Sequence, residues 1–461
     1  MSDASREPVL VIGAGIAGLS VARMLTEDHH VASLVVEASD RIGGRVETVY
    51  DGSGGRVKYE AGAWRVPMRH NRTIRLFQKL GVSLRRSSAP QRHAPRSEAI
   101  VGLSEWDVRA LHRKNPLSAD YEDLRTGQSG STAAQSMGDP DPDASADDGW
   151  MVSDDGFSAL VERLATGTRI LRDTRVVDVR RSGTEYIVQC RCLEGGGFVN
   201  RTYTATTVFI CVPPHCTERW TVVSQWCRAQ LYAVESNSVH TIHARTTAPT
   251  SFHAVSPSSL LGQSVSAQHK EAGWFQASLT GGRLARFWRN MRLALPAEFV
   301  GLILEEIRRT LHVSAEPDTI ASRFHEHAYH AWRPSPGFAE AKAVAACVMP
   351  NAKHLPNVFW CGEAFSSHQG WIEGALETAE LAVRVFTKKT PYVYPRRALQ
   401  PDEFVIEGRV IDAYAWANLH PGGAEAIRSV SGSNATDLFY HMRHGPGAWS
   451  VIHALQVAVD P

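Results

Sequence analysis

Apolar positions near the N-terminus fall into two short runs, PVLVIGAG from residue 8 and SLVVEAS from residue 33. The first run ends in closely spaced glycines, and the stretch between the runs has apolar residues at helical spacing. This pattern is typical of a strand, a tight glycine turn, a helix and a second strand. The N-terminus is therefore predicted to form a βαβ unit.

The rest of the chain alternates between periodic and loose stretches. Three alternating runs, TRVVDVRR at 174–181, TEYIVQCRC at 184–192 and TTVFICVPP at 206–214, predict strands, and PAEFVGLILEEIRRTLH at 296–312 has helical period.

Three other stretches are expected to connect structured elements. Residues 126–149 are rich in Gly, Ser, Pro and Asp and predict a surface loop, and 246–268 is a second loose connection. TKKTPYVYPRRALQPDE at 387–403 contains three prolines and predicts an inter-domain linker.

Length and charge limit the possible classes of protein. A chain of 461 residues is too long for one compact core and predicts two or three domains. Hydrophobic residues at 43% and charged residues at 21% describe an ordinary globular protein. The net charge of +1, without a basic cluster, gives no reason to expect nucleic acid as a partner.

Targeting signals and cysteine usage favour a cytoplasmic protein. No run approaches 18 apolar residues, MSDASREP lacks the layout of a signal peptide, and no hydrophobic tail follows the last segment, so we expect no membrane partner. The seven cysteines form an odd set without CxxC spacing. Such a set is typical of reduced thiols rather than of disulfides or a zinc site.

The glycine turn has the residues of a dinucleotide site. Gly13, Gly15 and Gly18 form GxGxxG between a strand and a helix, and Glu37 ends the next strand. The glycines permit the turn, the approach of a pyrophosphate and close helix packing, and a carboxylate at Glu37 can bind a ribose. The motif leaves NAD and FAD as alternatives.

Two further motifs narrow the cofactor, VVEASDRIGGRVET at 35–48 and NVFWCGEAFSSHQGWIEGALETAELAV at 357–383. The first resembles the signature that follows the βαβ unit in the flavin amine oxidase superfamily, and the second resembles the closing motif of that family. The resemblance implies non-covalent FAD. It places Arg45 at the pyrophosphate, the Val176 backbone at adenine and Glu363 at the ribityl or phosphate region. The other implied cofactor residues are Glu37, Ala38, Gly370, Trp371 and Ile372, the last three beside the flavin ring.

YEAGAWRVPMRH at 59–70 resembles the segment that binds the substrate carboxylate in L-amino-acid oxidases and tryptophan monooxygenases. There Arg65 would pair with an α-carboxylate, because guanidinium binds a carboxylate in a bidentate way. Alternatively, Arg65 lies at the surface or contacts FAD. Gly62, Ala63 and Trp64 would contact the cofactor, and His70 matches a family histidine but is equally compatible with packing.

One departure from the family concerns a lysine that many members place near the flavin. The strand expected to carry it, ESNSVHTIHARTT at 235–247, contains no lysine, and His240 is nearest to its place. Arg65, Trp371 and His240 are thus the candidate catalytic residues. Without the lysine, fast direct oxidation of the reduced flavin by O2 is in doubt.

The C-terminal segment carries two widely spaced histidines in recognisable motifs. HPGG at 420–423 is followed 24 residues later by His444, with a strand V-I-x-G-x-V-x-D before it and ATDLF with Phe439 between. This combination resembles the cytochrome b5 family. The resemblance implies that His420 and His444 ligate the iron of haem b, with His441 a weaker candidate. Two imidazoles fill both axial positions, so such a haem carries single electrons.

Together the resemblances imply an α/β FAD-binding domain of the Rossmann type with an interleaved substrate-binding domain, plus a small α+β cytochrome b5-like domain. The expected boundaries are 1–386 for the flavin region, 387–401 for a linker and 402–461 for the haem domain. Within the flavin region, the FAD-binding parts are expected at about 1–70, 150–215 and 350–386. The substrate-binding parts are expected at about 71–149 and 216–349.

The expected activity is oxidative deamination of an L-amino acid, with electrons passed to the fused haem, to O2 or to another acceptor. An oxidase of mono- or polyamines and a catalytically silent redox module are the alternatives. The sequence is also compatible with a dimer.

Overall fold

The computed structural model describes residues 5–52, 55–87, 150–223, 228, 231, 234–247, 260–265, 273–311, 313, 315–332, 355–366, 368–387, 392–393, 403–406, 409–414, 416–433, 435, 438–439, 442, 444 and 446–459. The chain divides into two compact units. The first contains residues 1–44, 164–234 and 335–461, and the second contains residues 45–163 and 235–334. Each unit is therefore built from segments that are distant in the sequence.

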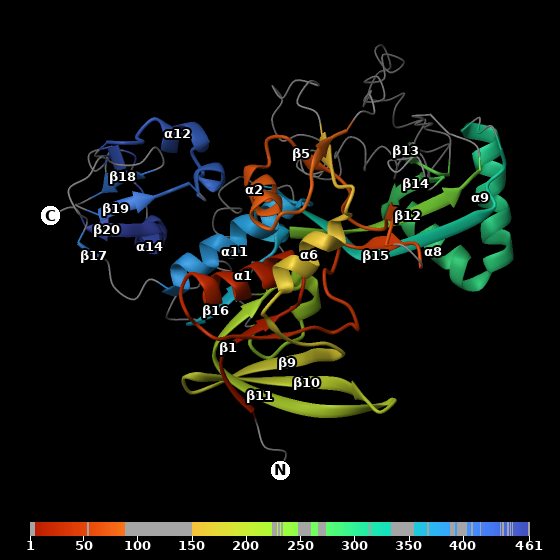
Figure 1. Cartoon of the computed structure of the whole chain (residues 1–461). Coiled ribbons are helices and arrows are strands. Elements are labelled where there is room, and N and C mark those ends of the chain that lie inside the picture. Colours follow the sequence, from red (N-terminus) through yellow and green to blue (C-terminus); the bar gives the residue numbers. More distant parts are fainter. Residues whose placement is uncertain are drawn as a thin grey trace, which may run out of the picture. The chain divides into compact units, whose positions relative to one another are not determined.

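A mixed sheet forms the centre of the first unit (Figure 1). Its order is β8-β2-β1-β11-β10-β9, with β16 also paired to β11. Strands β1, β2, β8, β11 and β16 run parallel, whereas β9, β10 and β11 form an antiparallel meander. The strands are β1 (Ser5–Ile12), β2 (Leu34–Val36), β8 (Arg169–Leu171), β9 (Thr174–Ser182), β10 (Glu185–Glu194), β11 (Gly197–Ile210) and β16 (Val358–Trp360).

Two long helices of this unit, α1 (Ile16–Glu27) and α11 (Ile372–Thr387), pack against each other. Most side chains of both helices are buried, as expected for helices beside a largely parallel sheet. Short 3-10 turns, η2 (Pro214–Thr217) and η4 (Glu363–Phe365), follow β11 and β16. The predicted βαβ unit is confirmed.

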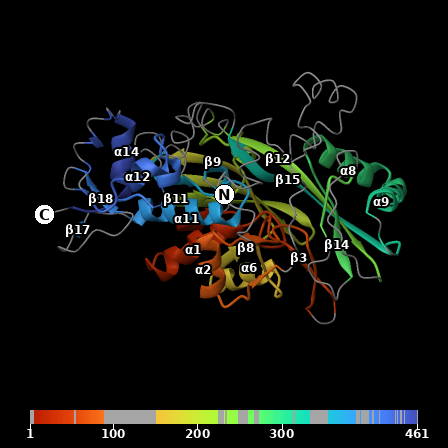
Figure 2. The same cartoon turned by 90° about the horizontal axis from the view of Figure 1, so that it is seen from above.

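The second unit contains a four-stranded sheet of order β13-β14-β12-β15. Its strands are β12 (Val234–Arg245), whose first residue belongs to the first unit, β13 (Gln263–Val265), β14 (Trp274–Gly281) and β15 (Thr319–Trp332). Helices α8 (Gly282–Ala294) and α9 (Pro296–Thr310) lie beside this sheet in both views (Figure 1, Figure 2). Their apolar side chains form one buried cluster with those of β12 and β14.

Smaller elements complete the second unit. Strands β3 (Thr48–Tyr50) and β4 (Val57–Glu60) form a hairpin, and β7 (Trp150–Val152) pairs with both β5 (Val66–Pro67) and β6 (Arg85–Arg86). The helices are α2 (Asn71–Lys79) and α6 (Phe157–Ala165), the last two residues of which count with the first unit.

The C-terminal segment forms a separate four-stranded sheet of order β17-β20-β19-β18. The strands are β17 (Tyr392–Val393), β18 (Glu403–Ile406), β19 (Arg409–Asp412) and β20 (Gln456–Val459), and the helical elements are η5 (Ala417–Leu419), α12 (Ala424–Arg428) and α14 (Pro446–Leu455). Strand β17 lies within the predicted linker and pairs with β20. Two linker residues thus belong to this sheet.

The strands expected at 174–181 and 184–192 and the helix expected at 296–312 are confirmed. The strand expected at 206–214 is confirmed as far as Ile210, where β11 ends, and a 3-10 turn begins at Pro214. The predicted loop at 126–149 lies outside the described residues. Within the second expected connection, Gln263–Val265 forms strand β13 instead, because it pairs with β14. In the described part of the chain, no helix is long and apolar enough to span a membrane.

Candidate functional site

The glycine turn after β1 is too tightly packed for any residue other than glycine at two of its positions. Gly13 has φ +103°, and a Cβ there would lie 2.8 Å from the carbonyl oxygen of Cys211. A Cβ on Gly18 would lie 2.0 Å from the carbonyl oxygen of Gly13, so helix α1 approaches the turn closely. Gly15 caps the N-terminus of α1. The backbone N–H groups at this helix start form the kind of cradle that holds a pyrophosphate.

Glu37 lies directly after β2, and its carboxylate is held by the backbone. Its Oε2 accepts a hydrogen bond from the Ala14 N–H at 2.8 Å, and its Oε1 accepts one from the Ser39 N–H at 3.0 Å. The carboxylate therefore lies beside the glycine turn, as a ribose-binding group must.

Val176 and Ala38 lie near the same edge of the sheet. The Thr174 N–H donates to the Glu37 carbonyl at 2.8 Å, which joins the start of β9 to the end of β2. Val176 follows two residues later and is partly buried, whereas Ala38 is exposed. The residues predicted for the adenosine half of the cofactor thus come together within the first unit.

The closing motif forms a tight turn before α11. Glu363 is buried, and its Oε2 accepts a hydrogen bond from the Gly370 N–H at 2.8 Å. Gly362, with φ +144°, donates its N–H to the Thr378 hydroxyl at 2.8 Å. Trp371 and Ile372 are partly buried at the start of α11. Glu363 therefore fixes the turn from which Trp371 and α11 begin.

In the second unit, the segment that precedes Arg65 is bound to residues 45–47. The Ala61 N–H donates to the Glu47 carbonyl at 2.8 Å, and the Ala63 N–H donates to the Arg45 carbonyl at 3.0 Å. A Cβ on Gly62 would lie 2.1 Å from the Arg45 carbonyl oxygen, so this close pairing requires glycine. The Arg45 guanidinium donates to the Ala328 carbonyl of β15 at 3.0 Å.

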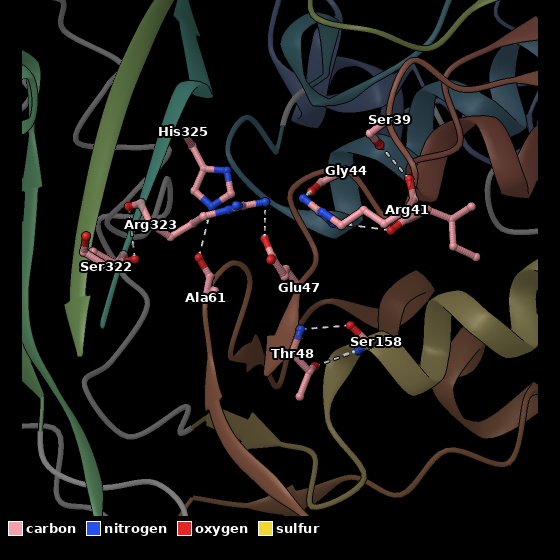
Figure 3. A network of polar contacts seen from close by, with 12 residues as sticks. Ser39, Arg41, Gly44, Glu47, Thr48, Ala61, Ser158, Ser322, Arg323 and His325 are labelled. Atoms are coloured by element: carbon pink, nitrogen blue, oxygen red, sulfur yellow. Dashed lines mark hydrogen bonds and ion pairs between the residues drawn. The ribbon is translucent and has the colours of Figure 1, made fainter. Parts of the chain in front are cut away.

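Strand β15 supports the same segment from the other side. Figure 3 shows that His325 points to Ala61 and that Arg323 points to Glu47. The His325 Nε2–H donates to the Ala61 carbonyl at 3.0 Å, and Arg323 pairs with Glu47 at 2.8 Å. Burial lowers the pKa of His325. The segment at 61–65 is thus held by backbone and side-chain contacts together.

Arg65 lies against two indole rings. The guanidinium carbon is 4.0 Å from the ring centre of Trp150 and 4.6 Å from that of Trp64. Burial lowers the pKa of Arg65 to about 10, which leaves it charged at neutral pH. Stacking uses the faces of a guanidinium, whereas its N–H donors lie in its plane. This arrangement suits the bidentate binding of a carboxylate.

His240 lies on the face of β12 that the helices cover. Side chains alternate along a strand, so His240 shares a face with Ile242 and Ala244, which belong to the core under α8 and α9. Its ring centre is 6.2 Å from that of Phe299 in α9 and 6.2 Å from that of Phe324. Burial lowers its pKa to about 3. His240 is therefore a neutral side chain packed among aromatic rings.

His243 lies on the opposite face of β12, beside the segment that leads to Arg65. Its ring stacks on Tyr59 with centres 4.2 Å apart, and Tyr59 also contacts Trp274 at 4.8 Å. Burial lowers the pKa of His243 to about 3. The structure thus brings His243, and not His240, next to the 59–65 segment. His70 is buried at the start of α2.

Sequence reasoning missed Trp150, His243 and His325. Trp150 meets Arg65 because β7 pairs with β5, with Trp150 opposite Pro67. His243 and His325 lie on alternating strands, where only the choice of face separates a histidine beside the 59–65 segment from one that packs under the helices, such as His240. The alternation of side chains along each strand was predictable from the sequence, but the face of the sheet that the helices cover was not.

His420 and His444 face each other in the C-terminal segment. Their ring centres are 6.0 Å apart. Two metal–nitrogen bonds of about 2 Å each, plus the ring on each side, match this separation, so one iron fits between the rings. The His444 Nδ1–H donates to the Phe439 carbonyl at 2.9 Å, which leaves Nε2 for the metal. His441 lies outside the described residues.

Aromatic side chains and a glycine lie beside the two histidines. The Phe439 ring stacks on His444 with centres 4.5 Å apart and planes 2° apart, and Trp449 packs on Phe439 edge-on at 5.1 Å. A Cβ on Gly422 would lie 3.0 Å from the His420 Cε1, so glycine gives this ring its room. Leu438 and Met442 are exposed near His444 in sequence. These residues fit haem.

Comparison with known proteins agrees with this geometry. The family described as flavin containing amine oxidoreductase matches residues 16–101 and 117–385, and the cytochrome b5-like heme/steroid binding domain matches residues 403–459. A crystal structure from Exiguobacterium, of a protein assigned provisionally as a protoporphyrinogen oxidase, has a TM-score of 0.57 and 13% identity, covering 85% of this chain and 100% of that one. This likeness shows the fold alone.

Curated relatives match over short segments. A flavin-dependent L-tryptophan oxidase of Lentzea aerocolonigenes is 47% identical over 76 residues, 16% of each chain. An L-amino-acid oxidase of Mus musculus is 41% identical over 78 residues, 17% of this chain and 12% of that one. A flavin-containing amine oxidase A of Canis lupus familiaris is 47% identical over 75 residues, 16% of this chain and 14% of that one. The chain thus spans less than a fifth of each relative's length.

The family match covers more than half of the chain, and the glycine turn, Glu37 and the closing motif have the geometry that FAD requires. The expected cofactors, FAD and haem, are confirmed by the two matched families. The chain therefore belongs to the flavin containing amine oxidoreductases, with a cytochrome b5-like haem domain at its C-terminal end.

Proposed function

We propose that this chain catalyses the FAD-dependent oxidative deamination of an L-amino acid. The product is an imino acid that hydrolyses to a 2-oxo acid and ammonia. Electrons pass to the fused haem, to O2 or to both. The family assignment supports an oxidoreductase acting on a small amine-bearing substrate, and relatives named as amino-acid oxidases support the narrower substrate class.

The setting of Arg65 carries this proposal. The guanidinium is charged and lies against Trp64 and Trp150, in a segment anchored by Arg45 and His325. A fixed guanidinium is a group that distinguishes an amino acid from the corresponding amine, because only the amino acid has an α-carboxylate.

The protein's part in this reaction is positioning. Arg65 binds the carboxylate, and the contacts from 45–47 and β15 limit its movement, which fixes the Cα of the substrate. Neutral His243 stacks on Tyr59, and the two rings form an aromatic and weakly polar surface beside the 59–65 segment. FAD, when bound, supplies the two-electron acceptor for oxidation of the Cα–N bond.

Strand β12 bears on the choice of electron acceptor. It carries His240 and His243 but no lysine. Many members of the family that the sequence resembles place a lysine near the flavin, where it aids reaction with O2. Its absence from this strand, together with a haem domain on the same chain, supports haem as an electron acceptor.

A spectrum of the purified protein under anaerobic conditions tests the proposal. Addition of L-amino acids, one at a time, is expected to bleach the flavin absorption. The corresponding decarboxylated amines, used as matched controls, are expected to leave it unchanged. If no compound of either panel bleaches the flavin, the chain is a catalytically silent redox module.

An oxidase of mono- or polyamines is a second candidate. The match to a flavin-containing amine oxidase A, 47% over 75 residues, favours it. In that case Arg65 supports the fold or the cofactor. Bleaching by amines alone would establish this function in place of the first.

A further inference from the structure

Cys211 and Cys361 lie at the same level of two neighbouring parallel strands. In the β11–β16 pair, Ile210 stands opposite Trp360, and the two cysteines are the next residues of their strands. The Cys361 N–H donates to the Ile210 carbonyl at 2.9 Å, so the pairing continues to this level. Neighbouring strands lie about 4.8 Å apart. This spacing is within the range of about 4.4–6.8 Å between the Cα atoms of disulfides.

The two thiols are in contact. Burial, and then a hydrogen bond with the Cys211 thiol, raise the pKa of the Cys361 thiol well above its ordinary value. Cys361 is buried, whereas Cys211 is partly exposed, so a small solute reaches Cys211 first. Both are free thiols in this structure.

The pair lies within the flavin-binding half of the first unit. The Cys211 carbonyl oxygen closes the space at Gly13, where a Cβ would lie 2.8 Å away, and the Cys211 N–H donates to the Ile12 carbonyl at 2.8 Å. Cys361 directly precedes Gly362 and Glu363 of the closing motif. A change at these two sulfurs therefore acts beside the glycine turn, which follows β1, and within the closing motif, which contains Cys361.

We propose that Cys211 and Cys361 form a dithiol site that a hydroperoxide oxidises to an intramolecular disulfide. This modification goes beyond the proposed function, because added hydrogen peroxide is sufficient as the oxidant. The Cys211 sulfur attacks one peroxide oxygen, the O–O bond breaks, and a sulfenic acid and water result. The Cys361 sulfur then attacks the sulfenic sulfur, the S–O bond breaks, and the S–S bond and a second water form.

In total, two thiols and one hydrogen peroxide give one disulfide and two waters, and two electrons pass from sulfur to oxygen. Cys361 reacts as a thiolate in the second step. Because burial keeps it protonated, disulfide formation is expected to become faster as the pH rises.

Mass spectrometry of the FAD-loaded full chain tests this proposal. Hydrogen peroxide treatment is expected to remove two hydrogen atoms, to yield one cross-linked peptide containing Cys211 and Cys361, and to be reversed by dithiothreitol. Cys211→Ser is expected to abolish the cross-link.

Cys190 and Cys192 provide the matched control. Both are buried, but they lie two residues apart on one strand, β10, about 6.8 Å from each other. The double variant Cys190→Ser, Cys192→Ser is expected to form the cross-link like the unaltered chain. Oxygen addition at Cys211 without a cross-linked peptide would overturn the proposal. If Cys211→Ser fails to fold, the peptide map of the unaltered chain decides alone.

Discussion

Arg65 is the side chain on which the proposed substrate recognition depends. Loss of one partner of a buried charged pair typically costs about 2–5 kcal/mol. Arg65→Ala is therefore expected to lower kcat/KM for an L-amino acid by about two to three orders of magnitude. The decarboxylated amine, which has no carboxylate, is expected to be affected much less. Steady-state kinetics on this pair of substrates measures the difference.

Arg56 is an exposed arginine of the same unit, so Arg56→Ala is the control and is expected to leave both values unchanged. Equal losses on both substrates in Arg65→Ala would show that Arg65 supports the cofactor or the fold. That result would leave the assignment to the family intact.

Glu60 is a buried carboxyl group that the sequence did not indicate. Burial raises its pKa from 4.5 to about 8, although it accepts hydrogen bonds from the Thr48 hydroxyl at 2.7 Å and the Phe157 N–H at 2.9 Å. A raised pKa means that the folded state binds the proton more tightly. The stability that Glu60 contributes is thus full below pH 4.5 and is lost as the pH rises through about 8.

Glu60→Gln removes this titration and keeps a group that forms hydrogen bonds. Thermal unfolding between about pH 5 and about pH 9 is therefore expected to show a Tm that falls less steeply in Glu60→Gln than in the unaltered chain. Parallel pH profiles for the two proteins would contradict the raised pKa.

Single residues were predictable where a short motif fixes them. Gly13, Gly18 and Glu37 follow from local spacing, and Arg65 follows from the resemblance of 59–70 to a family segment. The structure shows the close approaches, hydrogen bonds or ring contacts that these residues make. Trp150 was not predictable, because its contact with Arg65 depends on the pairing of strands that are distant in the sequence.

At the scale of elements, β12 shows what periodicity predicts and what it omits. The strand itself was expected, and alternation separates His240 from His243. Which of the two faces the core depends on where α8 and α9 pack, and this is a tertiary property. The catalytic role expected for His240 therefore remains a prediction. His240 packs against Phe299, whereas His243 stacks on Tyr59 and lies beside the 59–65 segment.

The turn at HPGG positions the first haem ligand. A Cβ at Gly422 would lie 3.0 Å from the His420 Cε1, so Gly422→Ala is expected to displace the ring. Haem affinity is expected to fall by about 10- to 100-fold, as for other changes next to metal ligands. His444→Ala, which removes a ligand, is expected to abolish the low-spin b-type spectrum while flavin binding persists. Absorption spectra during haem titration measure both effects.

Gly447 offers a matched control in the same segment, since nothing lies within 4 Å of a Cβ there. Gly447→Ala is expected to bind haem like the unaltered chain. His441→Ala tests the alternative ligand. Loss of the Soret band in His441→Ala, with an unchanged band in His444→Ala, would reassign the second axial position.

At the scale of the whole molecule, the two compact units divide the chain differently from the functional parts expected from the sequence, and those functional boundaries stay predictions. Residues 45–70 and 150–163, expected in the FAD-binding part, lie in the second unit. Hydrogen bonds between Thr48 and Ser158 at 2.8 and 2.9 Å, visible in Figure 3, join these segments. Such contacts connect residues 110 positions apart. Local patterns therefore did not reveal them.

The haem domain at 402–461 and the remainder of the chain carry opposite net charges, which favours their association. Residues 402–461 contain seven acidic and three basic side chains, a net charge of −4, whereas the whole chain has a net charge of +1. The remainder is therefore positive, and opposite charges attract at distances that salt screens. Because both cofactors belong to one chain, the haem domain is present at high effective concentration, and a weak contact is sufficient.

We therefore expect an active substrate to reduce the flavin first and the haem second. The haem phase is expected to lag the flavin phase because the haem, which with two histidine ligands accepts one electron at a time, would receive its electrons from the reduced flavin. Anaerobic stopped-flow mixing, followed at flavin and haem wavelengths, measures both phases. Rising salt is expected to slow the haem phase alone, because it weakens the attraction between the domains. In His444→Ala the flavin phase is expected to persist unchanged. If the flavin bleaches while the haem stays ferric over many turnovers, the haem serves an outside partner and not the flavin of its own chain.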